Sequence, residues 1–103
     1  MYGTDAGDQR TSCVIVQRYD TTVIMLGGCL DRAGVQQVEN DVRWTIGHCD
    51  DEVAILDATA VENADRWGIR LIEEAESMAA RHHVDLTVRP SPVLRELLDV
   101  TAR

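Results

Sequence analysis

Several features that mark common protein classes are missing from this chain of 103 residues. It has no lysine, no cluster of basic residues, no apolar run approaching roughly 18 residues and no signal-peptide core at its N-terminus. Eighteen acidic residues against ten basic ones give a formal charge of −8, which repels phosphate backbones and anionic lipids. We therefore expect a cytoplasmic protein that has no nucleic-acid partner and no membrane partner.

Catalytic signatures are also missing. The chain contains no nucleophile elbow, no phosphate-binding loop and no dinucleotide-binding glycine fingerprint. Asp31, Asp57 and Asp65 are expected near the same sheet edge, but helix capping explains Asp31 and Asp65, and a strand-end turn explains Asp57. His48 and Cys49 are adjacent in sequence, and adjacent side chains rarely converge on one substrate atom. The sequence therefore predicts no enzyme, no catalytic residue and no cofactor.

The three cysteines, at positions 13, 29 and 49, are widely spaced and odd in number. In a cytoplasmic chain they are expected to stay reduced, and Cys13 and Cys29 lie in apolar runs typical of small core residues. A zinc site would have to recruit His48, His82 or His83, and no CxxC or HxxxH pair supports one. We expect no metal.

Hydrophobic periodicity predicts one domain over residues 12–103, preceded by a Gly/Asp/Thr-rich flexible tail at 1–11. Strands are predicted at 13–16, 23–26, 52–58 and 84–88, and helices over 35–46, 68–79 and 92–101. The order β-β-α-β-α-β-α implies an α/β fold: a mixed four-stranded sheet with an N-terminal hairpin and about three packed helices.

Local signals place the boundaries of these elements. Residues 18–21 form a hairpin turn, Gly27-Gly28 breaks the second strand, and Gly47 closes the first helix. Ser91 and Pro92 open the last helix. The nearly continuous apolar run at 53–56 predicts a strand that is covered on both faces.

Four short motifs follow one another along the chain. They are GCLD at 28–31, ILDATAV at 55–61, DRWGI at 65–69 and PSPVLRELL at 90–98. In this order they resemble the G-x-L-D, V-L-D-x-S/T-x-V, D-S-S-G-L and P-S-P motifs of the STAS domain, the fold of bacterial anti-sigma factor antagonists. The resemblance covers nearly the whole chain after the tail, and it implies a STAS-like fold.

The resemblance also implies how such a protein is switched. In that family, the partner kinase, which is itself the anti-sigma factor, phosphorylates the first serine of D-S-S-G. The phosphate adds nearly two negative charges at a helix N-terminus and repels the partner. Here that phosphoacceptor position is Arg66, which cannot be phosphorylated, and the second serine is Trp67, whereas Asp65 and Gly68 remain.

Arg66 has two interpretations. It is either a tolerated cation neutralised by Asp65 or Asp31, or a fixed cation directed at an acidic partner or ligand. At about 100° per residue, Arg66, Ile69 and Glu73 share one helix face opposite the apolar stripe, which predicts an outward-facing Ile69. By the same geometry, Trp44 points away from its helix's stripe, which predicts exposure and favours a contact role.

These observations favour a protein-interaction module over an enzyme. The predicted partner-binding residues are Asp31, Asp65, Arg66, Trp67, Ile69 and Glu73. The expected partner is an anti-sigma factor protein kinase whose capture regulates a sigma factor, without the usual serine phospho-switch. The alternative is a STAS-type ligand sensor or structural subunit of a larger regulatory or transport assembly. Phosphorylation at Thr59 or Ser77 and a homodimer stay open.

Overall fold

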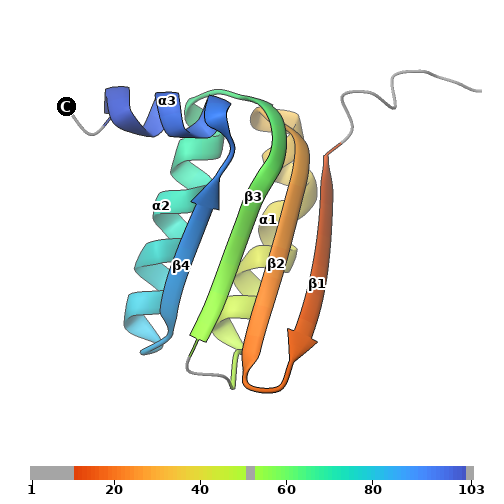
Figure 1. The fold of residues 1–103 in the computed structure, drawn as a ribbon, viewed down its shortest axis with the longest axis vertical. Coiled ribbons are helices and arrows are strands. Elements are labelled where there is room, and N and C mark those ends of the chain that lie inside the picture. The colour runs from red at the N-terminus through yellow and green to blue at the C-terminus, as the bar shows by residue number, and fades with distance from the viewer. Residues whose placement is uncertain (1–10, 51–52, 102–103) are drawn as a thin grey trace, which may run out of the picture.

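A computed structural model describes residues 11–50 and 53–101 of the chain. Its elements are β1 (Ser12–Arg18), β2 (Thr21–Leu30), α1 (Arg32–Gly47), β3 (Val53–Ala64), α2 (Arg66–Arg81), β4 (Asp85–Pro90) and α3 (Pro92–Thr101) (Figure 1). The predicted order β-β-α-β-α-β-α is confirmed. Of the predicted tail only Thr11 is described, and its hydroxyl donates a hydrogen bond to the carbonyl oxygen of Cys29.

The four strands form one mixed sheet in the order β1-β2-β3-β4. β1 is antiparallel to β2, whereas β3 is parallel to both of its neighbours. Both parallel connections move in the same direction along the sheet, and right-handed crossovers then place α1 and α2 on the same face. Figure 1 shows these two helices behind the sheet and α3 across one end of it.

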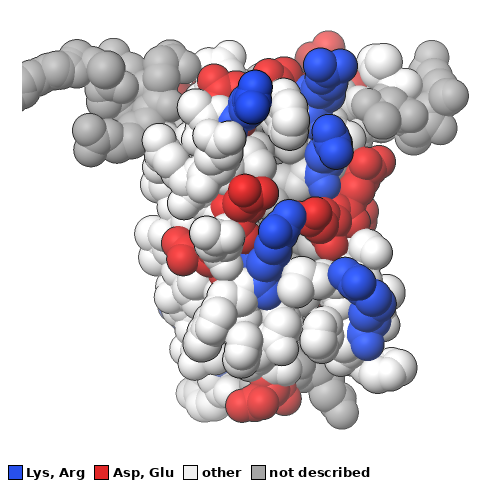
Figure 2. Space-filling view, turned by 180° about the vertical axis from the view of Figure 1, so that it is seen from behind, with Lys and Arg blue, Asp and Glu red and all other residues white. Residues whose placement is uncertain are grey.

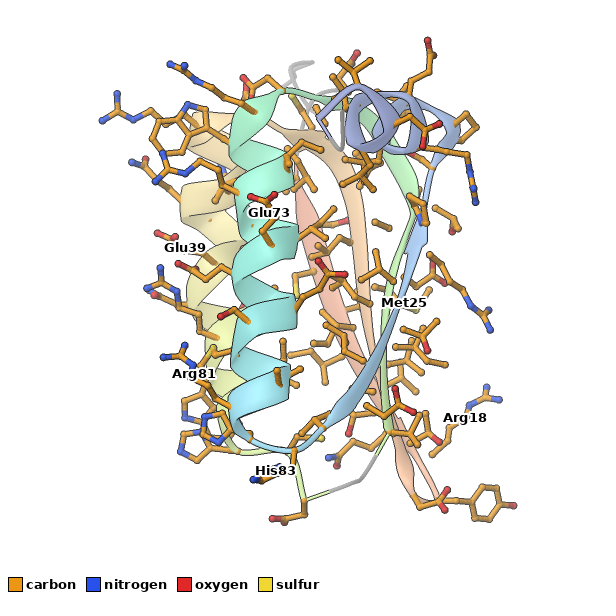
Figure 3. The ribbon with its side chains drawn as sticks, turned by 90° about the vertical axis from the view of Figure 1, so that its left-hand side faces the viewer. Arg18, Met25, Glu39, Glu73, Arg81 and His83 are labelled. Atoms are coloured by element: carbon orange, nitrogen blue, oxygen red, sulfur yellow. The ribbon has the colours of Figure 1, made fainter. Side chains whose placement is uncertain are left out.

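Only one face of the sheet is therefore covered by helices, and the predicted burial of the third strand on both faces is wrong. Along β3, Ala54, Leu56 and Ala58 are buried against the helices, whereas Val53 is exposed on the other face. Figure 3 shows the side chain of Met25, the β2 partner of Asp57, on the side of the sheet away from the helices.

The strands run further than the sequence signals indicated. β2 continues through Gly27-Gly28 to Leu30, and β3 continues to Ala64 instead of ending at residue 58. The glycines coincide with two register shifts that give β3 one extra residue each time, so they accompany bulges and do not end the strand. Glu52, the predicted first residue of the third strand, lies outside the described residues.

The helices cover the sheet with the predicted stripes, with one exception. In α1, Val35, Val38, Val42 and Ile46 are all buried, as expected. In α2, Ile69 was predicted to face solvent but is only 4% exposed. It lies about 60° from the buried Ile72 on the helical wheel, and α2 packs against α3 as well as against α1 and the sheet.

Replacing Ile69 by alanine tests this correction. Removing a buried isoleucine side chain is expected to lower the free energy of unfolding by about 2–5 kcal/mol. The matched control is Val100→Ala at an exposed position of α3, with an expected change within about 0.5 kcal/mol. Urea unfolding of both variants gives the comparison, and equal, small effects would show that Ile69 is a surface residue.

Candidate protein-interaction site

The ends of β2 and β3 place two helix N-termini side by side. The two strands stay paired to their last residues, with Leu30 opposite Ala64. The next residues are Asp31 and Asp65, and the Asp65 N–H donates to the carbonyl oxygen of Leu30 at 3.4 Å. We call this place the junction corner: residues 30–34 and 64–70, where β2 enters α1 and β3 enters α2.

Both aspartates at the junction corner are helix caps, as predicted. The Asp31 carboxylate accepts the N–H of Gly34 at 2.9 Å, and the Asp65 carboxylate accepts the N–H of Trp67 at 2.9 Å. The hydrogen bond from Gly34 lowers the pKa of Asp31, and the Cys29 thiol adds to this by donating to the same carboxylate. The two carboxylates thus satisfy amides that each helix start would leave unpaired.

The third predicted carboxylate does not reach the corner. Asp57 lies within β3, paired with Met25 on one side and Arg89 on the other. Its carboxylate accepts the hydroxyl and the N–H of Thr59 at 2.6 and 3.1 Å, and these bonds lower its pKa. The prediction of a strand-end turn former is wrong, because the strand continues past Asp57 through a bulge.

Gly68 allows α2 to approach the end of β2. A Cβ atom at this position would lie 3.0 Å from both the Cβ and the carbonyl oxygen of Leu30. Any larger side chain would push the first turn of α2 away from the sheet. The glycine of the DRWGI motif therefore allows the start of α2 to lie close to the end of β2, where α1 begins.

Arg66 is exposed at the first position of α2. Among residues 11–50 and 53–101 it forms no ion pair within 4.0 Å, and the Asp65 carboxylate is directed at the Trp67 amide instead. The interpretation in which Asp65 or Asp31 neutralises this guanidinium therefore finds no support. The cation faces solvent.

Trp67 is half-buried against the core and carries two arginines on its ring. The guanidinium carbon of Arg70 lies 5.1 Å from the ring centroid, and that of Arg32 lies 5.6 Å away. Such cation–π contacts hold both arginines at the corner. Sequence reasoning missed them, although Arg70 follows Trp67 at helical i, i+3 spacing; Arg32 becomes a neighbour only through the fold.

The remaining predicted residues are separated from this cluster. Ile69 is buried, so it offers no contact surface. Glu73 is exposed on α2, two helical turns from Arg66, and Figure 3 shows it on the helix below α3. The structure thus brings Asp31, Asp65, Arg66 and Trp67 together and leaves Glu73 at the margin.

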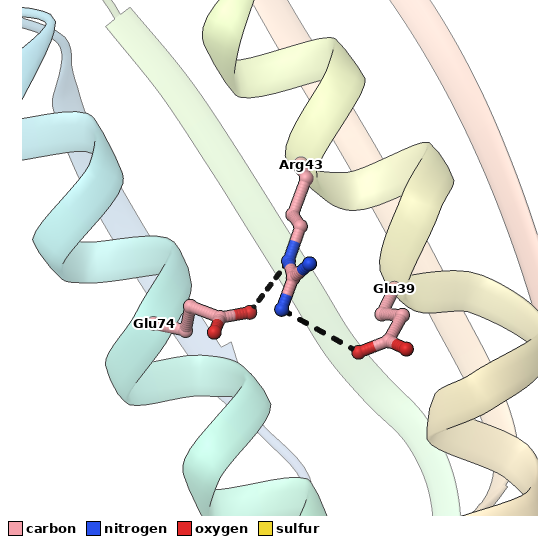
Figure 4. A network of polar contacts seen from close by, with 3 residues as sticks. All are labelled: Glu39, Arg43 and Glu74. Carbon is pink, nitrogen blue, oxygen red and sulfur yellow. Dashed lines mark hydrogen bonds and ion pairs between the residues drawn. The ribbon is translucent and has the colours of Figure 1, made fainter.

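A shallow groove of about 140 Å³ runs from Trp67 between α1 and α2. Arg43 crosses it: its Nε donates to Glu74 at 2.8 Å, and its guanidinium lies 3.7 Å from Glu39 (Figure 4). Figure 2 shows this helical face with basic and acidic side chains interspersed. The groove is lined by Val35, Glu39, Arg43, Trp67, Arg70, Leu71 and Glu74.

The cysteines, the possible metal ligands and the apolar character of the helices were the other features that the sequence raised. No disulfide joins the three cysteines among the described residues, and each is only partly buried, so the prediction of small core residues holds in part for Cys13, which packs against the core. Within the described ranges no group of three His, Cys, Asp or Glu side chains is arranged to hold a metal ion. No helix in that part of the chain is long and apolar enough to cross a membrane.

Comparison with known proteins identifies the fold. No family model matches the chain. No curated protein matches it. The structure is similar to an anti-sigma factor antagonist from Mycobacterium paratuberculosis, with a TM-score of 0.81 and 14% identity over 91% of this chain and 80% of that chain.

Two further structures agree. The anti-sigma factor antagonist SpoIIAA in its unphosphorylated form gives a TM-score of 0.71 and 19% identity, covering 88% of this chain and 81% of that one. The Bacillus cell fate determinant SpoIIAA in the phosphorylated form gives 0.66 and 22%, covering 88% and 82%. The chain has the STAS-like fold of anti-sigma factor antagonists.

The cap at Asp31 generates a pH-dependence. The pKa of Asp31 is lower in the folded protein than in the unfolded chain. Its carboxylate therefore stabilises the fold at pH values above the pKa of an aspartate in the unfolded chain, which is about 4. That stability is lost as the pH falls through the folded-state pKa. The unfolding free energy of wild type minus that of Asp31→Asn is expected to be positive at pH 7 and to shrink below pH about 4. Urea titrations across this range measure it, and a pH-independent difference would contradict the role.

Proposed function

We propose that this protein is an anti-sigma factor antagonist-like interaction module, cytoplasmic and without enzymatic activity, that binds a kinase-type anti-sigma factor through its junction corner and so regulates a sigma factor. The observation that carries the proposal is Arg66, which is exposed at the N-terminus of α2, beside the start of α1, and has no ion-pair partner among residues 11–50 and 53–101. The STAS resemblance assigns the phosphoacceptor serine to this position. Docking is then not governed by phosphate.

The hydroxyl groups near the corner support this proposal. Neither Arg66 nor Trp67 carries a hydroxyl, and the Thr59 hydroxyl is engaged by Asp57 at 2.6 Å. A phosphate on Thr59 would lie beside the Asp57 carboxylate, and the two negative charges would repel each other. Ser77 is exposed but lies three helical turns along α2 from Arg66. SpoIIAA, by contrast, is known in both phosphorylated and unphosphorylated forms.

The composition of the corner favours an acidic partner surface. Arg32 and Arg70 lie over the ring of Trp67, and Arg66 directly precedes this tryptophan, in a protein whose formal charge is −8. Tryptophan and arginine are the residues most enriched at interface hot spots. Local positive charge also orients an acidic partner during encounter. We infer that the partner presents carboxylates around an apolar contact for the indole ring.

At the junction corner, the alternative of a ligand sensor or a structural subunit has less support. The groove beside Trp67 encloses about 140 Å³, below the roughly 300 Å³ at which small-molecule pockets begin. Its lining does not include Arg66. A protein surface engages the exposed cation more readily than this groove would hold a small molecule.

Charge reversal at Arg66 tests the proposal. Candidate kinase-type anti-sigma factors are titrated into wild type and into Arg66→Glu, Arg66→Ser and Arg81→Glu, each with and without ATP. Arg81 is an exposed arginine at the other end of the same helix (Figure 3), so it matches the charge change away from the corner. We expect wild type and Arg81→Glu to bind alike regardless of ATP, and Arg66→Glu to bind about tenfold more weakly or worse.

Arg66→Ser restores the hydroxyl of the family motif and is expected to make binding sensitive to ATP. Equal affinity of all four proteins for the partner would show that Arg66 takes no part in docking. Loss of wild-type binding on addition of ATP would show that another residue carries a phospho-switch.

A further inference from the structure

Strand β1 leaves one edge of the sheet open. Its only strand neighbour in the described part of the chain is β2, so every second residue directs its backbone N–H and C=O away from the sheet. The strand, SCVIVQR, contains no proline and no carboxylate, and Arg18 is its only charged residue. Edges of this length and apolarity are templates for pairing with another strand unless they are protected.

Apolar side chains are exposed on both sides of this edge. On the open face of the sheet, Val14 is 54% exposed beside its β2 partner Met25, which is also exposed. On the helical face, Ile15 is 42% exposed and Trp44 of α1 is 65% exposed. The predicted exposure of Trp44 is thereby confirmed, and its position beside β1 gives that exposure a structural context.

Trp44 forms one wall of a groove between β1 and α1. Its ring stacks on His48 with centroids 4.3 Å apart and an interplanar angle of 17°. The His48 Nδ1 lies 2.9 Å from the carbonyl oxygen of Trp44, which fixes the pair on the last turn of α1. The groove, of about 360 Å³, is lined by Ile15, Gln17, Trp44, Thr45, His48 and Cys49.

We propose that a second copy of this chain pairs its β1 with this edge in antiparallel fashion, about a twofold axis at Ile15. The two four-stranded sheets then join into one continuous sheet. In this register, Ile15 faces Ile15 of the second copy and Val14 faces Val16 of the second copy. The interface is isologous, as expected of a homodimer, and it does not depend on the anti-sigma factor proposal.

The charge pattern favours a second copy over an unrelated strand. A chain with a formal charge of −8 repels itself on most surfaces, but this strand has no negative charge, and the register places each Arg18 opposite Ser12 of the second copy. The register also matches the apolar centre of the strand to itself, so side chains of similar size and chemistry face each other.

The helical side is self-complementary as well. One stripe of α1 carries Asp41, Trp44 and His48. Burial raises the pKa of the Cys13 thiol in β1, and the nearby negative charge of Asp41 raises it further. Asp41 therefore lies toward the N-terminal end of β1, whereas His48 lies beside Gln17 near its other end. In the antiparallel dimer, Trp44 approaches Trp44 of the second copy, and Asp41 is directed toward His48 of the second copy.

Sedimentation velocity of the full chain across a concentration series tests the dimer. Three variants are compared with wild type: Ile15→Lys, which places a charge at the twofold axis; Trp44→Ala, which removes an exposed ring; and Val100→Lys, a matched change at an exposed site on α3. We expect wild type and Val100→Lys to dimerise equally. Ile15→Lys and Trp44→Ala are expected to raise the dimer dissociation constant at least about tenfold.

Circular dichroism reports whether each variant is folded. Should Ile15→Lys fail to fold, Trp44→Ala decides, because an exposed ring is not needed for the core. A wild-type protein that stays monomeric at every concentration would overturn the proposal. A dimer that both Ile15→Lys and Trp44→Ala leave intact would overturn it too, since the interface would then lie elsewhere.

Discussion

The parallel pairing of β2 with β3 is the interaction on which the rest of the molecule depends. It holds to the last residue of each strand, Leu30 opposite Ala64, so two helices begin at adjacent points of one sheet edge. Gly68 allows the closest approach, because a side chain there would collide with Leu30. Ligands and partners of open α/β sheets commonly bind outside the carboxyl ends of their strands. The junction corner is such a place.

The helix caps determine what the corner presents. Asp31 and Asp65 each direct a carboxylate oxygen to a backbone amide, and among the described residues neither forms an ion pair with Arg66. The guanidinium groups of Arg32 and Arg70 lie over the ring of Trp67. This acidic protein therefore has a local cluster of positive charge around an aromatic ring at the junction corner. In our proposal this permanent positive charge takes the place of a hydroxyl whose phosphorylation would control docking.

The sequence predicted what depends on neighbours along the chain. The caps at Asp31 and Asp65, the stripe of α1 and the order of elements rest on local spacing, and all are confirmed. Tertiary contacts decided the rest. The extension of β3 past Asp57 follows its pairing with β2, and Ile69 is buried in a helix that packs against several other elements, α3 among them. The arginine pair on Trp67 joins two helices and has no single local signature.

Mapping of the bound surface by NMR tests the central claim most directly. A kinase-type anti-sigma factor is titrated into isotopically labelled protein, with and without ATP, and amide shifts are followed residue by residue. The account predicts the largest shifts at residues 30–34 and 64–70, unchanged by ATP. Shifts confined to the open face of the sheet or to β4, or a complex that dissociates when ATP is added, would contradict it.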